Sequence, residues 1–402
     1  MSPSHDGEGR QRPFSQSRHI NGADMRNRLE AISSATFLCI ALLTSGCAFL
    51  SDDDGSKSTQ RNATPQPVVV NGIRVSYADV VERTSSAVVQ IEAEIPATSS
   101  PNQFPFGGDE FFRRLFPNRN GEPRVQRGEG SGVLVDSDGT LLTNHHVIAG
   151  ATKILVKLQD GRTLEAKVLG SDAPSDLAVL KVEGANFPFL ELGDSDQVRI
   201  GDIVLAIGNP LGIGQTVTAG IISAKGRSTG ISDGTFEDFL QTDAPINKGN
   251  SGGALVNLNS ELIGINSQII SPSGGSIGIG FAIPSNMAKN VMSQLIEKGT
   301  VKRGRLGIMM EEVNAETAKR LGLKSQTGAL VSGVMPGGSA EKAGIKQGDV
   351  ILAVDGERME SGNALRNKIA GTLPGTTVKI TVFRNGSEIV LEAKLGEFTQ
   401  QS

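Results

Sequence analysis

Tryptophan is absent from this chain of 402 residues, tyrosine occurs once, and cysteine occurs only twice. Both cysteines, Cys39 and Cys47, lie in one apolar stretch near the N-terminus. The chain beyond them therefore has no disulfide and no thiolate metal site. The formal net charge of −4 is small, so the composition gives no support for nucleic-acid binding through a basic surface.

Histidine is also scarce, and two of the four, His5 and His19, lie in an N-terminal tail that we expect not to fold. The adjacent pair His145-His146 is then the only imidazole base available to the rest of the chain. A serine hydroxyl is a poor nucleophile until a positioned base takes its proton. Any serine–histidine chemistry must therefore use a histidine that precedes its serine.

A glycine-flanked serine, Ser251, lies in the segment Gly249-Asn250-Ser251-Gly252-Gly253, which fits the loose pattern G-x-S-x-G. The α/β-hydrolase elbow has this pattern but needs the order Ser, acid, His, and no histidine follows Ser251. The subtilisin order needs an acid before the histidine and an α/β sheet, which the strand pattern disfavours. The order His, Asp, Ser remains.

The fold class follows from many short strand-like runs that turn signals separate and no long helix interrupts. This pattern favours antiparallel barrels or sandwiches over a parallel α/β sheet. A helix is expected over Pro284–Lys298 with Ser285 as a possible cap, and two more at Ala315–Leu321 and at Ser361–Ala370, capped by Ser361. The predicted strands are Ser131–Val135, Thr140–Thr143, Lys153–Lys157, Thr163–Leu169, Leu177–Lys181, Ile203–Ile207, Gln215–Ala224, Ala254–Val256, Leu262–Ile270 and Gly278–Ile283.

The histidine pair lies at the end of a predicted strand, where successive side chains point to opposite faces. Only one of the two can then face the serine, and the strand pattern does not say which. Thirty residues on, Asp176 comes immediately before an apolar strand. Such an acid can fix the imidazole tautomer and stabilise the imidazolium, although an acid at this place can also be a surface turn residue.

Taken together, Thr-Asn-x-His-Val, Ser-Asp-Leu-Ala-Val and Gly-Asn-Ser-Gly-Gly-Ala-Leu resemble the HtrA/Deg family of chymotrypsin-like serine proteases. The resemblance extends over about residues 76–396. It implies a mainly β protein, a double β-barrel followed by a PDZ domain of α+β type. It also implies His146 as the base, Asp176 as the orienting acid and Ser251 as the nucleophile, with His145 at a variable position.

The same resemblance implies the surroundings of the nucleophile. The backbone N–H groups of Gly249 and Ser251, with Asn250, would form the oxyanion hole. A small apolar substrate pocket would be formed by Pro245, Ile279, Gly280 and Phe281. Because Pro245 stands where trypsin-like enzymes place a carboxylate, cleavage after small aliphatic residues is expected. No cofactor and no metal are expected, and the absence of a Walker-type loop is consistent with an ATP-independent enzyme.

The last 95 residues or so resemble a bacterial PDZ domain, which captures a peptide C-terminus by strand addition. An apolar C-terminal side chain would lie among Leu306, Ile308 and Leu365. Because only one such domain is present, a homotrimer through the protease domains is expected rather than a large cage. The peptide-binding residues implied are Arg305, Leu306, Gly307, Ile308, Met309 and Leu365.

The N-terminal segment is predicted to be an export signal, since an apolar run at 31–50 follows positive charge and precedes three aspartates. Cys47 ends an imperfect lipobox and is a lipidation candidate; an uncleaved membrane anchor and simple cleavage are the alternatives. The expected divisions are a tail and signal (1–50), a flexible tether (51–75), a protease domain (76–299) with a Phe-rich loop (98–127), a PDZ domain (300–396) and a short tail (397–402).

The function expected from these features is an ATP-independent serine endopeptidase of the bacterial cell envelope that degrades misfolded proteins. The alternative is a regulated stress sensor or chaperone whose protease is latent until a peptide binds the PDZ domain. The expected partners are unfolded substrates, peptide C-termini and further copies of the chain, with membrane attachment through the N-terminus and no nucleic acid.

Overall fold

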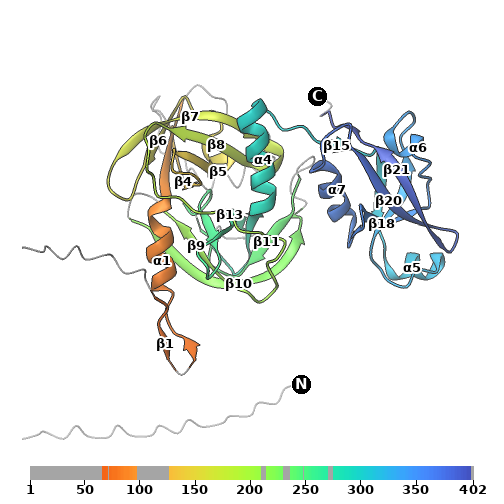
Figure 1. The fold of residues 1–402 in the computed structure, drawn as a ribbon, viewed down its shortest axis with the longest axis horizontal. Coiled ribbons are helices and arrows are strands. Elements are labelled where there is room, and N and C mark those ends of the chain that lie inside the picture. The colour runs from red at the N-terminus through yellow and green to blue at the C-terminus, as the bar shows by residue number, and fades with distance from the viewer. Residues whose placement is uncertain are drawn as a thin grey trace, which may run out of the picture. The chain divides into compact units, whose positions relative to one another are not determined.

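The computed structural model describes residues 66–70, 72–96, 126–209, 214–229, 236–247, 249–269 and 275–399. Within them the chain forms two closed barrels of six strands, a further six-stranded sheet and two sheets of two strands each (Figure 1). The mainly β fold class is therefore confirmed. The signal segment with Cys47, residues 51–65 of the expected tether and most of the Phe-rich loop lie outside the described residues. Residues 66–70 and 72–75 of that tether are described and include two short paired strands. No helix in the described part of the chain is long and apolar enough to cross a membrane.

The first barrel closes six antiparallel strands in the order β3-β4-β5-β8-β7-β6. Its central strand β8 is buried almost throughout, because its two faces pack on two different hydrophobic cores. The strands are β3 (Val88–Ile95), β4 (Gln126–Leu134), β5 (Thr140–Thr143), β6 (Lys153–Lys157), β7 (Thr163–Asp172) and β8 (Leu177–Val182).

The second barrel closes in the order β10-β11-β14-β13-β12-β9, again with antiparallel neighbours. Each barrel thereby pairs all of its strands and leaves no open sheet edge. The strands are β9 (Ile203–Gly208), β10 (Thr216–Arg227), β11 (Phe239–Thr242), β12 (Ala254–Val256), β13 (Leu262–Ile269) and β14 (Gly280–Pro284).

One hydrophobic core joins the barrels. Leu142 and Leu177 of the first barrel and Ile207 and Ile265 of the second belong to the same buried cluster. Helix α4 (Ser285–Lys298) follows β14 and adds Leu295 to this cluster, where it contacts β7, β8 and β13. Side chains of both barrels are therefore buried against each other where the barrels meet.

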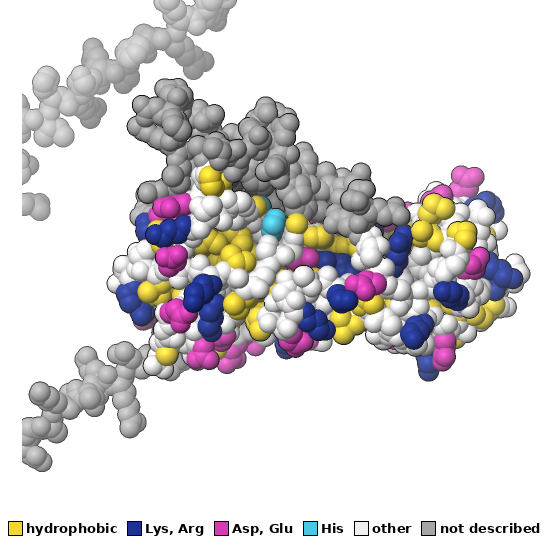
Figure 2. Space-filling view, turned by 90° about the horizontal axis from the view of Figure 1, so that it is seen from above, with side chains coloured by type: hydrophobic (Ala, Val, Ile, Leu, Met, Phe, Trp, Pro, Cys, Tyr) yellow, Lys and Arg dark blue, Asp and Glu magenta, His cyan; other side chains and the backbone are white. Residues whose placement is uncertain are grey.

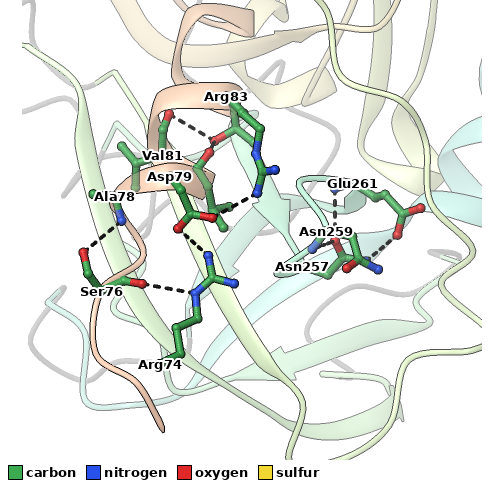
Figure 3. A network of polar contacts seen from close by, with 11 residues as sticks. Arg74, Ser76, Ala78, Asp79, Val81, Arg83, Asn257, Asn259 and Glu261 are labelled. Atoms are coloured by element: carbon green, nitrogen blue, oxygen red, sulfur yellow. Dashed lines mark hydrogen bonds and ion pairs between the residues drawn. The ribbon is translucent and has the colours of Figure 1, made fainter. Parts of the chain in front are cut away.

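Helix α1 (Ala78–Thr84) precedes the first barrel and is fixed by charged groups (Figure 3). Asp79 accepts hydrogen bonds from the guanidinium groups of both Arg74 and Arg83, the latter at 3.1 Å. Before it, β1 (Val69–Val70) and β2 (Ile73–Arg74) pair only with each other. The side chains of Val69 and Val70 are about half exposed on this hairpin.

The C-terminal part contains a separate core and a sheet in the order β16-β17-β18-β20-β21, with β19 beside β18. Strand β16 forms one edge of this sheet, and α7 contacts it. The strands are β15 (Gly304–Arg305), β16 (Ile308–Glu312), β17 (Ala329–Val334), β18 (Val350–Val354), β19 (Glu357–Arg358), β20 (Thr377–Arg384), β21 (Ser387–Lys394) and β22 (Gly396–Glu397). The helices are α5 (Ala315–Leu321), α6 (Ser339–Lys342) and α7 (Gly362–Ala370).

The predicted helices all form, but one cap is wrong. Ser361 accepts from the Ala364 N–H and caps α7 as expected. The cap position of α4 is held instead by Pro284, and Ser285 is the first helical residue, whose hydroxyl donates to the Gly193 carbonyl at 2.7 Å. Strand β3, helix α1 and the one-turn helix α3 (His145–Ile148) were not predicted.

Candidate active site

The histidine pair lies in α3, directly after β5, and not in the strand itself. The His146 ring contacts the carboxylate of Asp176, with Nδ1 2.8 Å from Oδ2 and 3.0 Å from Oδ1. The backbone N–H of His146 also donates to Oδ1 at 3.0 Å. This one carboxylate therefore fixes both the ring and the backbone of His146, as an orienting acid must.

Asp176 adopts the left-handed conformation, with φ 54° and ψ 38°, at the end of the 3-10 turn η3 (Ala173–Ser175). Aspartate is among the few residues that tolerate this conformation. Its carbonyl accepts from the Asn144 side-chain amide at 3.0 Å and from the His145 N–H at 3.1 Å. Five donors from the segment 144–146 and its surroundings thus converge on Asp176 once Ser267 is added.

Ser267 of β13 donates its hydroxyl to Asp176 Oδ2 at 2.9 Å. Burial alone would raise the pKa of the Asp176 carboxyl, but the charge of His146 and the hydrogen bonds from His146 and Ser267 bring that pKa below its usual value. Ser267 comes from the second barrel and carries no motif in the sequence. The sequence gives one indication of its role: Ser267 lies in an apolar strand, where a buried hydroxyl needs a hydrogen-bond partner.

His145 points elsewhere: its Nδ1 hydrogen bonds to the Ser171 hydroxyl of β7. Burial lowers the pKa of His145, and the nearby charges of Asp176 and Asp172 oppose that effect. The two rings separate because adjacent residues of a helical turn project about 100° apart. Figure 2 shows histidine (cyan) at the surface beside hydrophobic side chains.

The segment that carries Ser251 depends on two glycines with positive φ, Gly249 at 98° and Gly252 at 81°. A Cβ on Gly252 would lie 2.1 Å from the Ser131 carbonyl oxygen, so that no side chain fits there. A Cβ on Gly130 would meet Val147 at 2.7 Å and the Ser251 carbonyl at 3.3 Å. The chain next to His146 and the chain at Ser251 therefore meet at Gly130.

The Asn250 N–H donates to the Asn247 carbonyl at 3.0 Å, which removes it from the expected oxyanion hole. In the described part of the chain, the N–H groups of Gly249 and Ser251 donate to no backbone carbonyl. Ser251 itself is largely buried, with 8% of its surface exposed.

The expected pocket residues occupy β14 and the segment before Ser251. Pro245 is exposed and Ile279 is half-buried, whereas Phe281 packs in the shared core with its ring centroid 5.5 Å from that of Phe239. The space beside Gly280 is closed by Ile246, since a Cβ on this glycine would lie 3.0 Å from the Ile246 side chain. Ile246 was not predicted, and it adds an apolar wall.

The expected peptide-binding residues lie at the start of β16 and on α7. Gly307 has φ 81°, and its carbonyl accepts from the Met335 N–H at 3.0 Å. Leu306 and Leu365 are buried in the core of the C-terminal part, Ile308 is half-buried, and Met309 is 62% exposed. Arg305 contacts the Met335 sulfur with its guanidinium group.

Comparison with known proteins agrees with this architecture. Residues 130–265 match the trypsin-like peptidase domain family, and residues 304–395 match the PDZ domain family. A probable periplasmic serine protease do/HhoA-like of Haemophilus influenzae is 48% identical over 331 residues, which cover 80% of this chain and 71% of the relative. The periplasmic pH-dependent serine endoprotease DegQ of Escherichia coli is 47% identical, with 81% and 71% covered.

Among solved structures, the HtrA-type protease AlgW with tripeptide is 44% identical, covers 81% of this chain and 98% of its own, and gives a TM-score of 0.65. Two barrels with an imidazole–carboxylate pair and a glycine-rich serine segment define a chymotrypsin-like serine endopeptidase, here followed by a single PDZ domain. The chain belongs to the HtrA family of serine endoproteases.

Proposed function

We propose that this protein hydrolyses unfolded polypeptides in the periplasm through an acyl-enzyme on Ser251, with His146 as base and Asp176 as orienting acid. The observation that carries the proposal is the contact of His146 Nδ1 with both oxygens of the Asp176 carboxylate, at 2.8 and 3.0 Å. With Nδ1–H donating to that carboxylate, Nε2 is left as the basic nitrogen.

In the first step Ser251 Oγ attacks the scissile carbonyl carbon while His146 Nε2 takes the hydroxyl proton. The carbonyl oxygen becomes an oxyanion, for which the N–H groups of Gly249 and Ser251 are the proposed donors. The imidazolium then gives its proton to the leaving amine, and the C–N bond breaks. Water repeats the sequence on the acyl-enzyme and releases the acid.

Substrate preference is proposed from the apolar surroundings of Gly280. Pro245, Ile279 and Ile246 offer no carboxylate to pair with a lysine or arginine, so cleavage after small aliphatic residues is favoured. Phe281 would support this pocket from the shared core, where it is 3% exposed. A preference for unfolded segments follows because only an extended chain reaches a site that lies between two barrels.

The C-terminal domain is proposed to bind peptide C-termini by strand addition beside β16. Two features support this: β16 is an edge strand of the described sheet, and α7 contacts it. Gly307, in the left-handed conformation, would turn its neighbouring N–H groups toward a carboxylate. Ile308 and Met309 would supply contacts to the added strand.

Export, attachment and self-association complete the proposal. Periplasmic relatives and the N-terminal charge pattern support export, and a diacylglyceryl group on Cys47 would attach the protein to a membrane. Mass spectrometry of the mature N-terminus tests that attachment. A homotrimer is expected, with the exposed Val69–Val70 hairpin as a surface that self-association would cover.

The central experiment compares cleavage of unfolded casein by the wild-type protein and by Ser251→Ala. We expect cleavage that the substitution abolishes, because it removes the hydroxyl of the proposed nucleophile. Equal cleavage by both proteins contradicts the assignment of Ser251. Cleavage that begins only when a C-terminal peptide is supplied would replace general degradation by the latent, sensor-type activity.

A further inference from the structure

We propose that Ser131 is a positioning residue whose hydroxyl holds the backbone of the oxyanion hole in its working orientation. The inference rests on the proposed roles of Ser251 and Gly249. Ser131 lies in β4 of the first barrel and none of its surface is exposed. A hydroxyl buried so completely in a barrel wall needs hydrogen-bond partners. The partners of the Ser131 hydroxyl indicate which part of the site it holds.

The Ser131 hydroxyl donates to the Gly249 carbonyl at 2.6 Å and accepts from the Asn209 N–H at 2.8 Å. The backbone of the same residue also reaches the serine segment, since its N–H donates to the Ser251 carbonyl at 2.8 Å. Ser131 therefore binds the carbonyl groups on both sides of Asn250. One residue of the first barrel clamps the segment of the second barrel that carries the nucleophile.

Each peptide of this segment is fixed at a defined end. A trans peptide points its C=O and its N–H in opposite directions. The peptide between Gly249 and Asn250 is held at its oxygen by Ser131 and at its nitrogen by the Asn247 carbonyl, 3.0 Å away. The next peptide is held at the Asn250 oxygen by the Gly253 N–H at 2.9 Å, so its other end, the Ser251 N–H, is directed away from that contact.

The peptide that follows is fixed at both ends, by Ser131 at the Ser251 carbonyl and by the Asn266 carbonyl at the Gly252 N–H, 2.8 Å away. The weakest point of the segment is Gly249, because a glycine at φ 98° has no Cβ to restrict its rotation. The Ser131 hydroxyl acts at this point. Without it, the buried Gly249 carbonyl has to turn to find another partner. That rotation takes place about the flexible Gly249 Cα and changes the angle between the peptide with this carbonyl and the preceding peptide, which carries the Gly249 N–H. The proposed donor then loses its fixed direction relative to Ser251.

Ser131 also connects the segment that carries the proposed base with the segment that carries the proposed nucleophile. The Ser131 carbonyl accepts from the Thr143 hydroxyl at 2.7 Å, and Thr143 is the last residue of β5 before the segment that leads to His146. The segment before His146 in the first barrel and the segment around Ser251 in the second barrel therefore both hydrogen bond to Ser131. Loss of the hydroxyl alone leaves the two backbone contacts in place, which isolates its effect on Gly249.

The test compares Ser131→Ala with Ser285→Ala, a matched control, in the full-length protein. Ser285 is also a fully buried serine whose hydroxyl donates to a glycine carbonyl, Gly193, but it lies in α4. A direct oxyanion donor is worth about 100- to 1,000-fold in kcat, and we expect an indirect support to be worth about 10- to 100-fold. For Ser131→Ala, kcat on a peptide substrate should fall by that factor while KM stays within about twofold, as expected for an interaction made only in the transition state.

A peptide boronic acid, whose adduct with the nucleophilic serine carries an oxygen in the oxyanion hole, should lose affinity for Ser131→Ala in parallel with kcat/KM. Ser285→Ala should keep both. If Ser131→Ala does not fold, Ser131→Cys fills the same space with a weaker donor and should show a smaller fall in kcat at unchanged KM. An unchanged kcat in whichever variant folds overturns this inference, while activity in Ser251→Ala would instead overturn the proposed function.

Discussion

Arg303 and Asp172 form a buried bidentate ion pair, with Nη1 2.9 Å from Oδ1 and a second contact between Nη2 and Oδ2. Both side chains are less than a tenth exposed. Asp172 also accepts from the Ser175 N–H at 3.0 Å and so starts the 3-10 turn that ends at Asp176. Arg303, which precedes the first strand of the PDZ domain, is therefore paired with the residue that caps the turn leading to Asp176, the proposed orienting acid.

Removal of one partner of this pair should be costly, because it leaves the other charge buried and unpaired. We expect Arg303→Met to lower the free energy of unfolding by about 3–5 kcal/mol. Urea unfolding followed by circular dichroism measures this. As a control, Lys167→Met removes the pair with Glu183, whose two side chains are exposed to solvent, and should change the free energy of unfolding far less. Equal costs for the two substitutions would contradict the buried character of the first pair.

The two histidines should differ sharply in mutational effect. His146→Ala removes the proposed base and should reduce kcat on casein-derived peptides by at least about a thousandfold. His145→Ala removes a ring that hydrogen bonds to Ser171 and should keep kcat within a fewfold of wild type. Steady-state kinetics of both variants decide the point, and the reverse pattern would transfer the base to His145.

The stability of the protein should fall on mild acidification, in part through His145. Its pKa is lowered in the folded protein by burial, so that below about pH 6.5 the unfolded chain binds more protons than the folded one. Burial of the neutral His145 ring therefore costs no stability above about pH 6.5. As the pH falls below that value, the free energy of unfolding decreases, because protonation favours the unfolded chain. The groups that face the ring are Asp176, Asp172, His146 and Ser171.

This pH dependence is measured as the change in Tm between pH 7.5 and pH 5.5 for the wild type and for His145→Gln. The wild type should lose more, since glutamine does not titrate. If the two proteins lose the same number of degrees, His145 has no part in the acid sensitivity.

Ser267 should influence the rate through Asp176 without touching the substrate. Ser267→Ala removes one hydrogen bond to the carboxylate and should lower kcat by about tenfold, with KM nearly unchanged. Because the lost bond favoured the charged carboxylate, the acid limb of the kcat/KM profile should also move. Ser171→Ala, which removes the hydroxyl beside His145, is the control and should alter neither quantity.

Peptide capture by the PDZ domain should depend on a free carboxylate. A peptide that ends in an apolar residue should bind with a measurable Kd, and amidation of its C-terminus should weaken binding by at least about tenfold, because backbone N–H groups would then lose a charged partner. Isothermal titration with both peptides tests this. Binding that amidation leaves unchanged would place the contact elsewhere.

Much of the fold could be predicted because the barrel strands are short runs rich in Val, Ile and Leu with turn residues between them. The strands from Ser131 to Ile283 could be found in this way. Strand β3 was not predicted, although its sequence from Val89 to Ile95 alternates apolar and polar residues, a signal that could have identified it. The predicted cap of α4 was wrong because the Ser285 hydroxyl hydrogen bonds to the distant Gly193 carbonyl and not to the backbone of its own helix.

The chemistry was predicted unevenly. His146, Asp176 and Ser251 each stand in a distinctive motif, so the sequence alone suggests them. Ser267 and Ser131 do not, because their importance comes from what two separate barrels bring within 3 Å of a carboxylate and a carbonyl. Asn250 differs from these two serines: the sequence suggests its N–H as an oxyanion donor, but in the folded chain this N–H donates to the Asn247 carbonyl.

The division of the site between two closed barrels has a consequence for protein engineering. His146 and Asp176 belong to one barrel and Ser251 to the other, so a chain cut between β8 and β9 would give two fragments, each with an incomplete set of reacting groups. Hydrolysis would then require the fragments to associate and bury their shared core. Its rate would rise with the product of the two fragment concentrations, and the protein would serve as a reporter that turns proximity into cleavage.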